Sequence, residues 1–201
     1  STGASALLFT SYPPPTSPLQ ALLNRGTRAF ALPLTHYTLT LPEPFDQGQP
    51  LGRFDNGLEL SAIAWDDQGP PAPGREAVLL TYWTLVASLQ HPPQPIVANP
   101  PPPGIYTGPR LAVFVHMLAA DGTFLVGDDA LGVAPLTLKS GDRFVQIHRL
   151  PLARDVSATS YVLEMGLYDP YTGVRWSVRG TVASSESDRL MIPVKGATMM
   201  P

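Results

Sequence analysis

The sequence predicts an all-β fold, an antiparallel β-sandwich that is jelly-roll-like, with one short N-terminal helix and a proline-rich loop insert. The chain of 201 residues contains 24 prolines and 17 glycines, and residues that break helices at this density favour short strands joined by turns. From about His36 onward, apolar residues recur at every second position in about nine or ten short runs. Turn residues separate these runs, as in a sandwich and unlike a fold of alternating strands and helices.

The N-terminal part differs from the remainder, and the sequence predicts an extension over residues 1–35 followed by a sandwich domain over residues 36–201. The predicted helix begins at Ser17, which can cap it, and has Pro18 at its first helical position. Gly26 suits its exit. This helix is expected to be a short packing element.

Several strands can be placed with their faces. The segment Glu76–Ala87 is apolar on both faces, which predicts a central strand. Asp121 and Gly122 lie between two apolar runs, a strong signal for a hairpin. The segment Val174–Val182 alternates, which predicts that Val174, Trp176, Val178 and Val182 point inward.

The insert is the segment Gln90–Pro109, which contains eight prolines. A strand inside a sheet does not accept this many, because proline cannot donate to the ladder. The sequence therefore predicts an extended excursion of polyproline type between two strands.

The amino-acid composition limits the classes of partner that this chain is expected to bind. The net charge is −3 with only 13 lysines and arginines, so no basic stripe exists and binding of nucleic acid is not expected. Cysteine is absent, which excludes disulfides and thiolate chemistry.

No apolar run of about 18 residues appears, so no membrane span is expected in this chain. The first residue is Ser1 rather than Met, which we interpret as a processed product or a fragment, with a possible anchor upstream.

The sequence contains no recognisable catalytic motif, and no catalytic residue, metal ligand or cofactor is predicted. The acidic residues fall in turns, where Asp mostly serves the turn itself. Two alternatives stay open. A hydrolase would need two carboxylates facing each other across a cleft, and a structural calcium ion could use Asp66 and Asp67 or Asp128 and Asp129.

Three residues are candidates for ligand binding. Tyr106 and Tyr171 are predicted in loops, where an exposed aromatic ring can stack on a sugar. His116 lies in the middle of a predicted strand, where its ring either hydrogen-bonds a neighbour or contacts a ligand. The sequence favours the loops and the proline-rich insert over the histidines as the place of function.

A series of motifs in the second half resembles the extracytoplasmic C-terminal β-sandwich domain of bacterial membrane glycosyltransferases of the protein-mannosyltransferase type, and related envelope proteins. The resemblance covers about residues 53–194. The family's short link is replaced here by the insert, and Leu138 and Lys139 stand where it usually has a tryptophan. The motifs are Pro73-Gly74-Arg75-Glu76, Leu80-Thr81-Tyr82-Trp83, Val113-Phe114-Val115-His116-Met117-Leu118, Asp121-Gly122, Leu150-Pro151-Leu152, and Gly166-Leu167-Tyr168-Asp169-Pro170.

In that family the transferase chemistry belongs to the membrane part, so the resemblance implies an accessory module and not an enzyme. It implies an extracytoplasmic location, at the cell surface or associated with the membrane. The expected function is a non-catalytic contact with cell-envelope glycan or with a neighbouring protein. The alternative is a structural subunit of a larger membrane-associated complex that docks through Gln90–Pro109.

Overall fold

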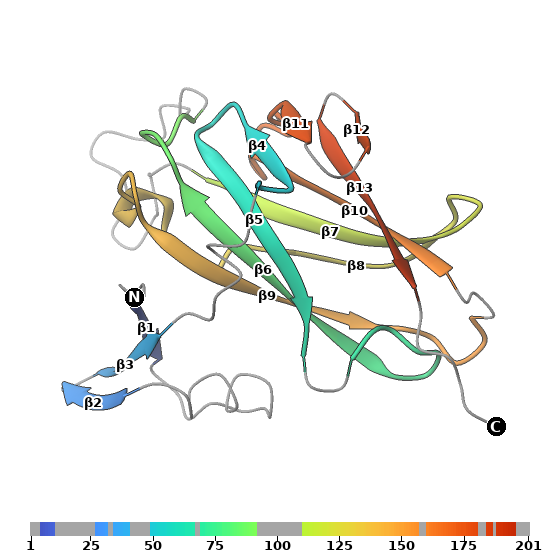
Figure 1. The fold of residues 1–201 in the computed structure, drawn as a ribbon, viewed down its shortest axis with the longest axis horizontal. Coiled ribbons are helices and arrows are strands. Elements are labelled where there is room, and N and C mark those ends of the chain that lie inside the picture. The colour runs from blue at the N-terminus through green and yellow to red at the C-terminus, as the bar shows by residue number, and fades with distance from the viewer. Residues whose placement is uncertain are drawn as a thin grey trace. The chain divides into compact units, whose positions relative to one another are not determined.

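The computed structural model describes residues 5–10, 27–31, 34–40, 49–66, 69–91, 110–156, 160–180, 184–186 and 188–195, with backbone alone up to residue 40 and over 184–186. The chain divides into two compact units, Ser1–Gly48 and Gln49–Pro201. We describe each unit by itself (Figure 1). Within the described residues no helix has the length and apolar character needed to cross a membrane.

The first unit contains a three-stranded antiparallel sheet in the order β1-β3-β2. Its strands are β1 (Ser5–Thr10), β2 (Thr27–Ala31) and β3 (Leu34–Thr40). The strand predicted from His36 onward is β3, so it belongs to this unit, whereas the sequence placed the start of the sandwich at residue 36. The helix predicted from Ser17 to Gly26 lies outside the described residues.

The described part of the second unit is a β-sandwich of two five-stranded sheets, which confirms the predicted fold class. One sheet has the order β11-β4-β5-β6-β9 and the other β12-β13-β10-β7-β8, with all pairs antiparallel. Figure 1 shows β5, β6 and β9 crossing in front of β7, β8 and β10. The strands are β4 (Gly52–Phe54), β5 (Leu58–Trp65), β6 (Glu76–Leu85), β7 (Ala112–Ala119), β8 (Phe124–Ala130), β9 (Arg143–Pro151), β10 (Ser160–Tyr168), β11 (Val178–Gly180), β12 (Ser184–Glu186) and β13 (Arg189–Lys195), with a short 3-10 helix η2 (Pro135–Thr137) between β8 and β9.

The core lies between the two sheets and is centred on Trp83 of β6, which is fully buried. Its ring stacks near Phe144 at 6.5 Å between centroids and tilts against Phe54 at 5.7 Å. The indole N–H donates to the hydroxyl of Thr81 at 2.8 Å, so the one polar atom of the buried ring is satisfied. Trp176 is also buried in this core, which confirms the inward position predicted for it.

The structure bears on the predicted hairpin and on the predicted strand after residue 174. The hairpin at Asp121 and Gly122 is confirmed: Gly122 has φ +86° and the Thr123 N–H donates to Asp121 Oδ1 at 2.9 Å. The prediction that Val174 points inward is wrong, because Val174 is exposed and the strand begins only at Val178. The reason is the turn after β10, which continues through residue 174.

At the edge where β8 meets β9, a histidine and an aspartate join the two sheets. His148 of β9 is fully buried, and its Nδ1 lies 3.1 Å from Asp128 Oδ2 of β8. Burial lowers the pKa of His148 below its usual 6.5, although the nearby Asp128 carboxylate partly opposes this shift. The other ring nitrogen, Nε2, is buried with no hydrogen-bond partner. A second proton there would have no acceptor, so the folded protein favours the neutral ring.

This pair predicts a loss of stability in mild acid. A histidine with a lowered pKa in the folded state adds stability above the unfolded value of 6.5, and that stability is lost as pH falls through 6.5 toward the folded pKa. We expect the melting temperature to be lower at about pH 5.5 than at about pH 7.5. His148→Asn, which keeps a donor close to the Nδ1 position, should make this difference smaller. His91→Asn, a change at an exposed histidine, is the control, and equal pH dependence of the wild type and His148→Asn would contradict the account.

Candidate functional site

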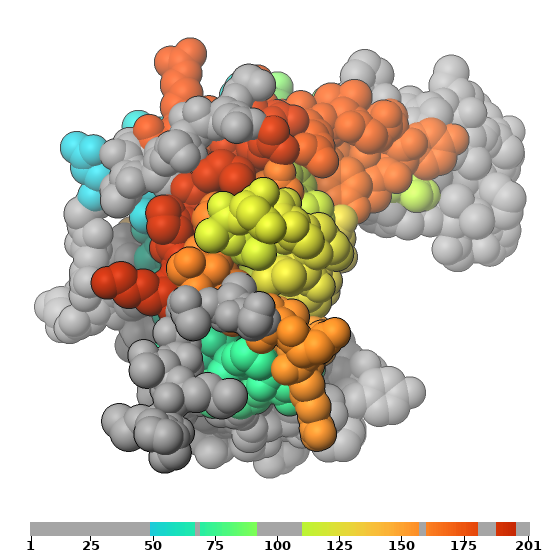
Figure 2. Space-filling model, turned by 90° about the vertical axis from the view of Figure 1, so that its right-hand side faces the viewer, coloured from blue at the N-terminus to red at the C-terminus, as the bar shows by residue number. Residues whose placement is uncertain are grey.

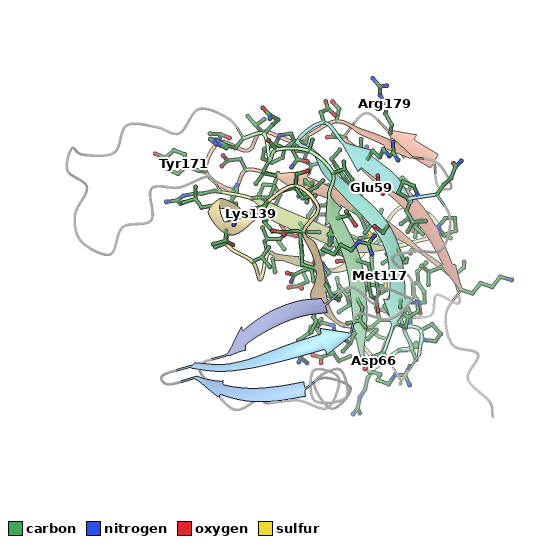
Figure 3. All side chains as sticks on the ribbon, turned by 60° about the vertical axis from the view of Figure 1, so that its left-hand side comes forward. Glu59, Asp66, Met117, Lys139, Tyr171 and Arg179 are labelled. Atoms are coloured by element: carbon green, nitrogen blue, oxygen red, sulfur yellow. The ribbon has the colours of Figure 1, made fainter. Side chains whose placement is uncertain are left out.

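His116 lies on the outer face of the sheet that contains β7. Along β7, Val113, Val115 and Met117 point into the core and alternate with residues of the opposite face. Figure 3 labels Met117 among the core side chains. The period of two therefore places His116 outward, and its side chain is about one-quarter exposed, at 24%.

His116 belongs to a row of polar side chains, joined by hydrogen bonds and one longer contact, that crosses four adjacent strands. Its Nδ1 lies 2.9 Å from Glu164 Oε2 on β10, and its Nε2 lies 3.4 Å from Asp129 Oδ1 on β8. Arg189 of β13 donates to the second oxygen of Glu164 at 2.5 Å. We call Asp129, His116, Glu164 and Arg189 the polar row.

The register of the paired strands brings the side chains of the polar row together. Glu164 lies directly opposite His116 in the ladder between β10 and β7, whereas Asp129 lies opposite Phe114, one outward position away. This places the imidazole between two carboxylates.

Glu164, one of the two carboxylates in the polar row, is nearly buried. Burial alone would raise its pKa, but the hydrogen bonds from His116 and Arg189, together with the arginine charge, lower the pKa of Glu164 below its usual value. Tyr168 donates its hydroxyl proton to Asp129 Oδ2 at 3.0 Å. Burial, reinforced by this bond to Asp129, raises the pKa of Tyr168. The tyrosine therefore keeps its proton, and the row is a set of fixed donors and acceptors.

Aromatic rings surround His116 on the same face. Phe114 is buried and tilts against it with centroids 5.1 Å apart. Phe124 of β8 meets the imidazole edge-on at 5.4 Å and 81°, and 58% of its surface is exposed. An exposed large ring beside fixed polar groups is a typical arrangement for recognising a sugar.

Gly127 completes this arrangement because it lies opposite His116 in the ladder between β7 and β8. A Cβ atom at Gly127 would come within 2.7 Å of His116 Cδ2 and 3.2 Å of the Phe124 ring. The glycine thus gives both rings their positions and leaves exposed backbone between Phe124 and Asp129. Glycine inside a strand often marks a place where another group approaches the backbone closely. We call His116, Phe124, Gly127 and Asp129 the β8 face; Figure 2 shows the yellow-green atoms of the β7–β8 hairpin at the molecular surface.

Tyr171 occupies a separate place, in the turn that follows β10. The buried carboxylate of Asp169 accepts the N–H groups of Tyr171 at 2.7 Å and Thr172 at 3.1 Å, and this holds the turn. The ring of Tyr171 is exposed, with the Arg110 guanidinium 5.3 Å from its centroid. Figure 3 shows Tyr171 at the same end of the sandwich as Lys139, in the loops beyond the strands. The structure therefore surrounds His116 and Tyr171 with different neighbours.

Tyr106 and residues 92–109 of the insert lie outside the described residues. Ligand binding by Tyr106 and docking through the insert therefore stay predictions. The same holds for a calcium site at Asp66 and Asp67, because Asp67 is not described.

The alternative calcium site at Asp128 and Asp129 does not fit the geometry. Asp128 points toward His148 at the sheet edge, whereas Asp129 points outward to His116 and Tyr168. Their carboxylates thus bond to different partners on opposite faces of β8. Across the described ranges, no group of three or more His, Cys, Asp or Glu side chains is arranged to hold a metal ion.

Most of the β8 face and the polar row escaped the sequence analysis. No sequence pattern singles out Phe124, Glu164 or Arg189 as a functional residue. One signal was available: Gly127 interrupts the apolar run that begins at Phe124. The pairing itself was not available, because the partners of His116 lie up to 48 residues away in the chain.

No protein-family model and no curated protein sequence matches this chain. Among solved structures it is similar to the C-terminal domain of Wzt, at 16% identity over 77% of this chain and 83% of that one, with a TM-score of 0.45. It is also similar to a β-glucuronidase of Bacteroides uniformis, at 14% identity and a TM-score of 0.34, over 75% of this chain but only 15% of the enzyme. A calcium-binding mutant of Bacteroides uniformis β-glucuronidase 2 gives 13% identity and a TM-score of 0.34, over 76% of this chain and 19% of that one. These similarities are distant, and the assignment of the second unit to the β-sandwich class rests on its own two sheets.

Proposed function

We propose that the second unit is a non-catalytic module that contacts a cell-envelope glycan through the β8 face. The observation that carries this proposal is the exposed ring of Phe124 edge-on to His116, whose Nε2 lies 3.4 Å from the exposed carboxylate of Asp129. A sugar presents an apolar ring face and a rim of hydroxyl groups, and these two features need an aromatic surface and fixed hydrogen-bonding groups. The β8 face supplies both within one pair of strands.

The charge state of the polar row supports a binding role over a hydrolytic one. A glycosidase needs a carboxylic acid whose pKa is raised so that it can protonate the leaving group. The pKa of Glu164 is instead lowered by its bonds to His116 and Arg189. Glu164 is therefore held as an ionised carboxylate by His116 and Arg189, which does not suit the role of a general acid.

The sequence resemblance adds a location to this proposal. It suggests a module outside the cytoplasm, either as the tail of a membrane glycosyltransferase or as a separate envelope protein. The reading frame upstream of Ser1 tests this part: a series of transmembrane segments favours the tail, and a signal peptide or single anchor favours the separate protein.

A glycan array followed by calorimetric titration tests the binding itself. Phe124→Ala should weaken binding of the array's best ligand by at least about tenfold, because loss of a stacking ring costs about 1.4 kcal/mol or more. The matched control is Leu136→Ala, which removes another exposed apolar side chain from η2 and should leave the affinity unchanged. The proposal fails if no envelope glycan binds, or if Phe124→Ala binds as tightly as the wild type.

A further inference from the structure

The charges around Phe124 have one sign. Strand β8 and the hairpin before it contain three acidic residues, Asp121, Asp128 and Asp129, and no lysine or arginine. Asp128 points to the buried His148, so it does not contribute to the outer face. Asp121 and Asp129 are exposed, and they lie on either side of Phe124 along the chain.

The arginines on this side of the sandwich are already paired with other carboxylates. Arg189 binds Glu164 at 2.5 Å, and Arg175 lies over Phe114 at 4.7 Å with its guanidinium 3.3 Å from Asp188. Asp129 has different partners, namely the imidazole of His116 and the hydroxyl of Tyr168. An arginine held by a carboxylate has less positive charge to offer a ligand, so the charged groups that β8 and its hairpin present to solvent are the carboxylates of Asp121 and Asp129.

The oxygens of Asp129 also accept hydrogen bonds and cannot donate them while the group is ionised. A sugar hydroxyl can donate to such an oxygen, whereas the carboxylate or phosphate of an acidic sugar can only repel it. Two like charges about 5 Å apart near a protein surface repel by enough to change an affinity by about tenfold or more.

We infer that the β8 face selects uncharged sugars and discriminates against sugars that carry a carboxylate or phosphate. This inference rests on the proposed glycan contact and names the chemical class of its ligand. The carboxylate of Asp129 provides the charge discrimination, and the ring of Phe124 provides the apolar contact with the sugar.

The test is a titration with matched neutral and acidic probes. The probes are glucose, galactose and mannose oligosaccharides together with the corresponding uronate oligosaccharides of equal length, measured at low salt so that charge effects are not screened. The wild type should bind its best neutral oligosaccharide about tenfold more tightly than the matching uronate. Asp129→Asn, which keeps the shape but removes the charge, should reduce that preference to less than about threefold.

Asp142→Asn is the control, because it removes the same charge from the loop that follows η2, where Asp142 accepts the Lys139 N–H. It should leave the preference unchanged. Equal or tighter binding of the uronate by the wild type overturns the inference while leaving the proposed function intact. Binding of neither probe overturns both, and an equal loss of preference in Asp129→Asn and Asp142→Asn assigns the effect to net charge and overturns the role of Asp129.

Discussion

Replacing Trp83 with alanine is expected to lower the free energy of unfolding by about 3–5 kcal/mol, the largest effect of any single change considered for this chain. Trp83 is fully buried at the centre of β6, between Phe54 and Phe144, and its indole N–H is bonded to Thr81. Truncation would leave a cavity that two neighbouring rings cannot fill by small shifts, and it would remove a donor from a buried hydroxyl.

Chemical denaturation followed by circular dichroism measures this change. For a unit of this size, each 1 kcal/mol corresponds to a shift of roughly 2–4 °C in the melting temperature. Phe124→Ala is the control, because it also removes an aromatic ring, but one that is mostly exposed. A loss of less than about 1 kcal/mol for Trp83→Ala would mean that this ring is not the centre of the core.

The second large effect is expected from Gly166→Ala, with a loss of about 1–3 kcal/mol from overpacking. A Cβ atom at Gly166 would lie 2.5 Å from Cε1 of Phe114 and 2.8 Å from the carbonyl oxygen of Asp188. Phe114 cannot move outward freely, because it is buried beneath the guanidinium of Arg175. Because Phe114 also tilts against His116, the change should alter the β8 face as well.

Thermal unfolding of Gly166→Ala and of Gly132→Ala separates this clash from the general effect of replacing a glycine. At Gly132 the added Cβ would meet only Gln146 Oε1, at 3.2 Å. This oxygen accepts the Gly132 N–H at 2.6 Å, and it needs to move by only a few tenths of an ångström to make room. The control should therefore change stability little. If both variants lose the same stability, the close packing of Phe114 on Gly166 is not what requires the glycine.

The sequence predicted the elements of the sandwich better than their ends. The continuous apolar character of Glu76–Ala87 predicted a central strand with apolar residues on both faces, and β6 has buried side chains at Ala77, Val78 and Leu79 in succession. The same reasoning failed at Val174, because the side chain of Asp169 holds a turn that extends past it. A periodic pattern does not contain the hydrogen bonds that end a strand.

The candidate site was less predictable than the fold, for a physical reason. The ring of His116 was expected either to hydrogen-bond a neighbour or to contact a ligand, and the structure shows a hydrogen bond to Glu164. Its partners, Asp129 and Glu164, come from strands on either side of β7, so their proximity depends on two registers that no local pattern determines. This is why loop residues such as Tyr171 looked more favourable than the outer face of the sheet.

A nuclear magnetic resonance titration tests the central claim most directly. The isotope-labelled chain of 201 residues would be titrated with the neutral oligosaccharide that binds it most tightly, and the backbone amide signals followed. The account predicts that the largest shifts fall on the β8 face, at His116, Phe124, Gly127 and Asp129, while the amide of Tyr171 changes little. Shifts concentrated at Tyr171 and Arg110, or spread evenly with no change at Gly127, would contradict it.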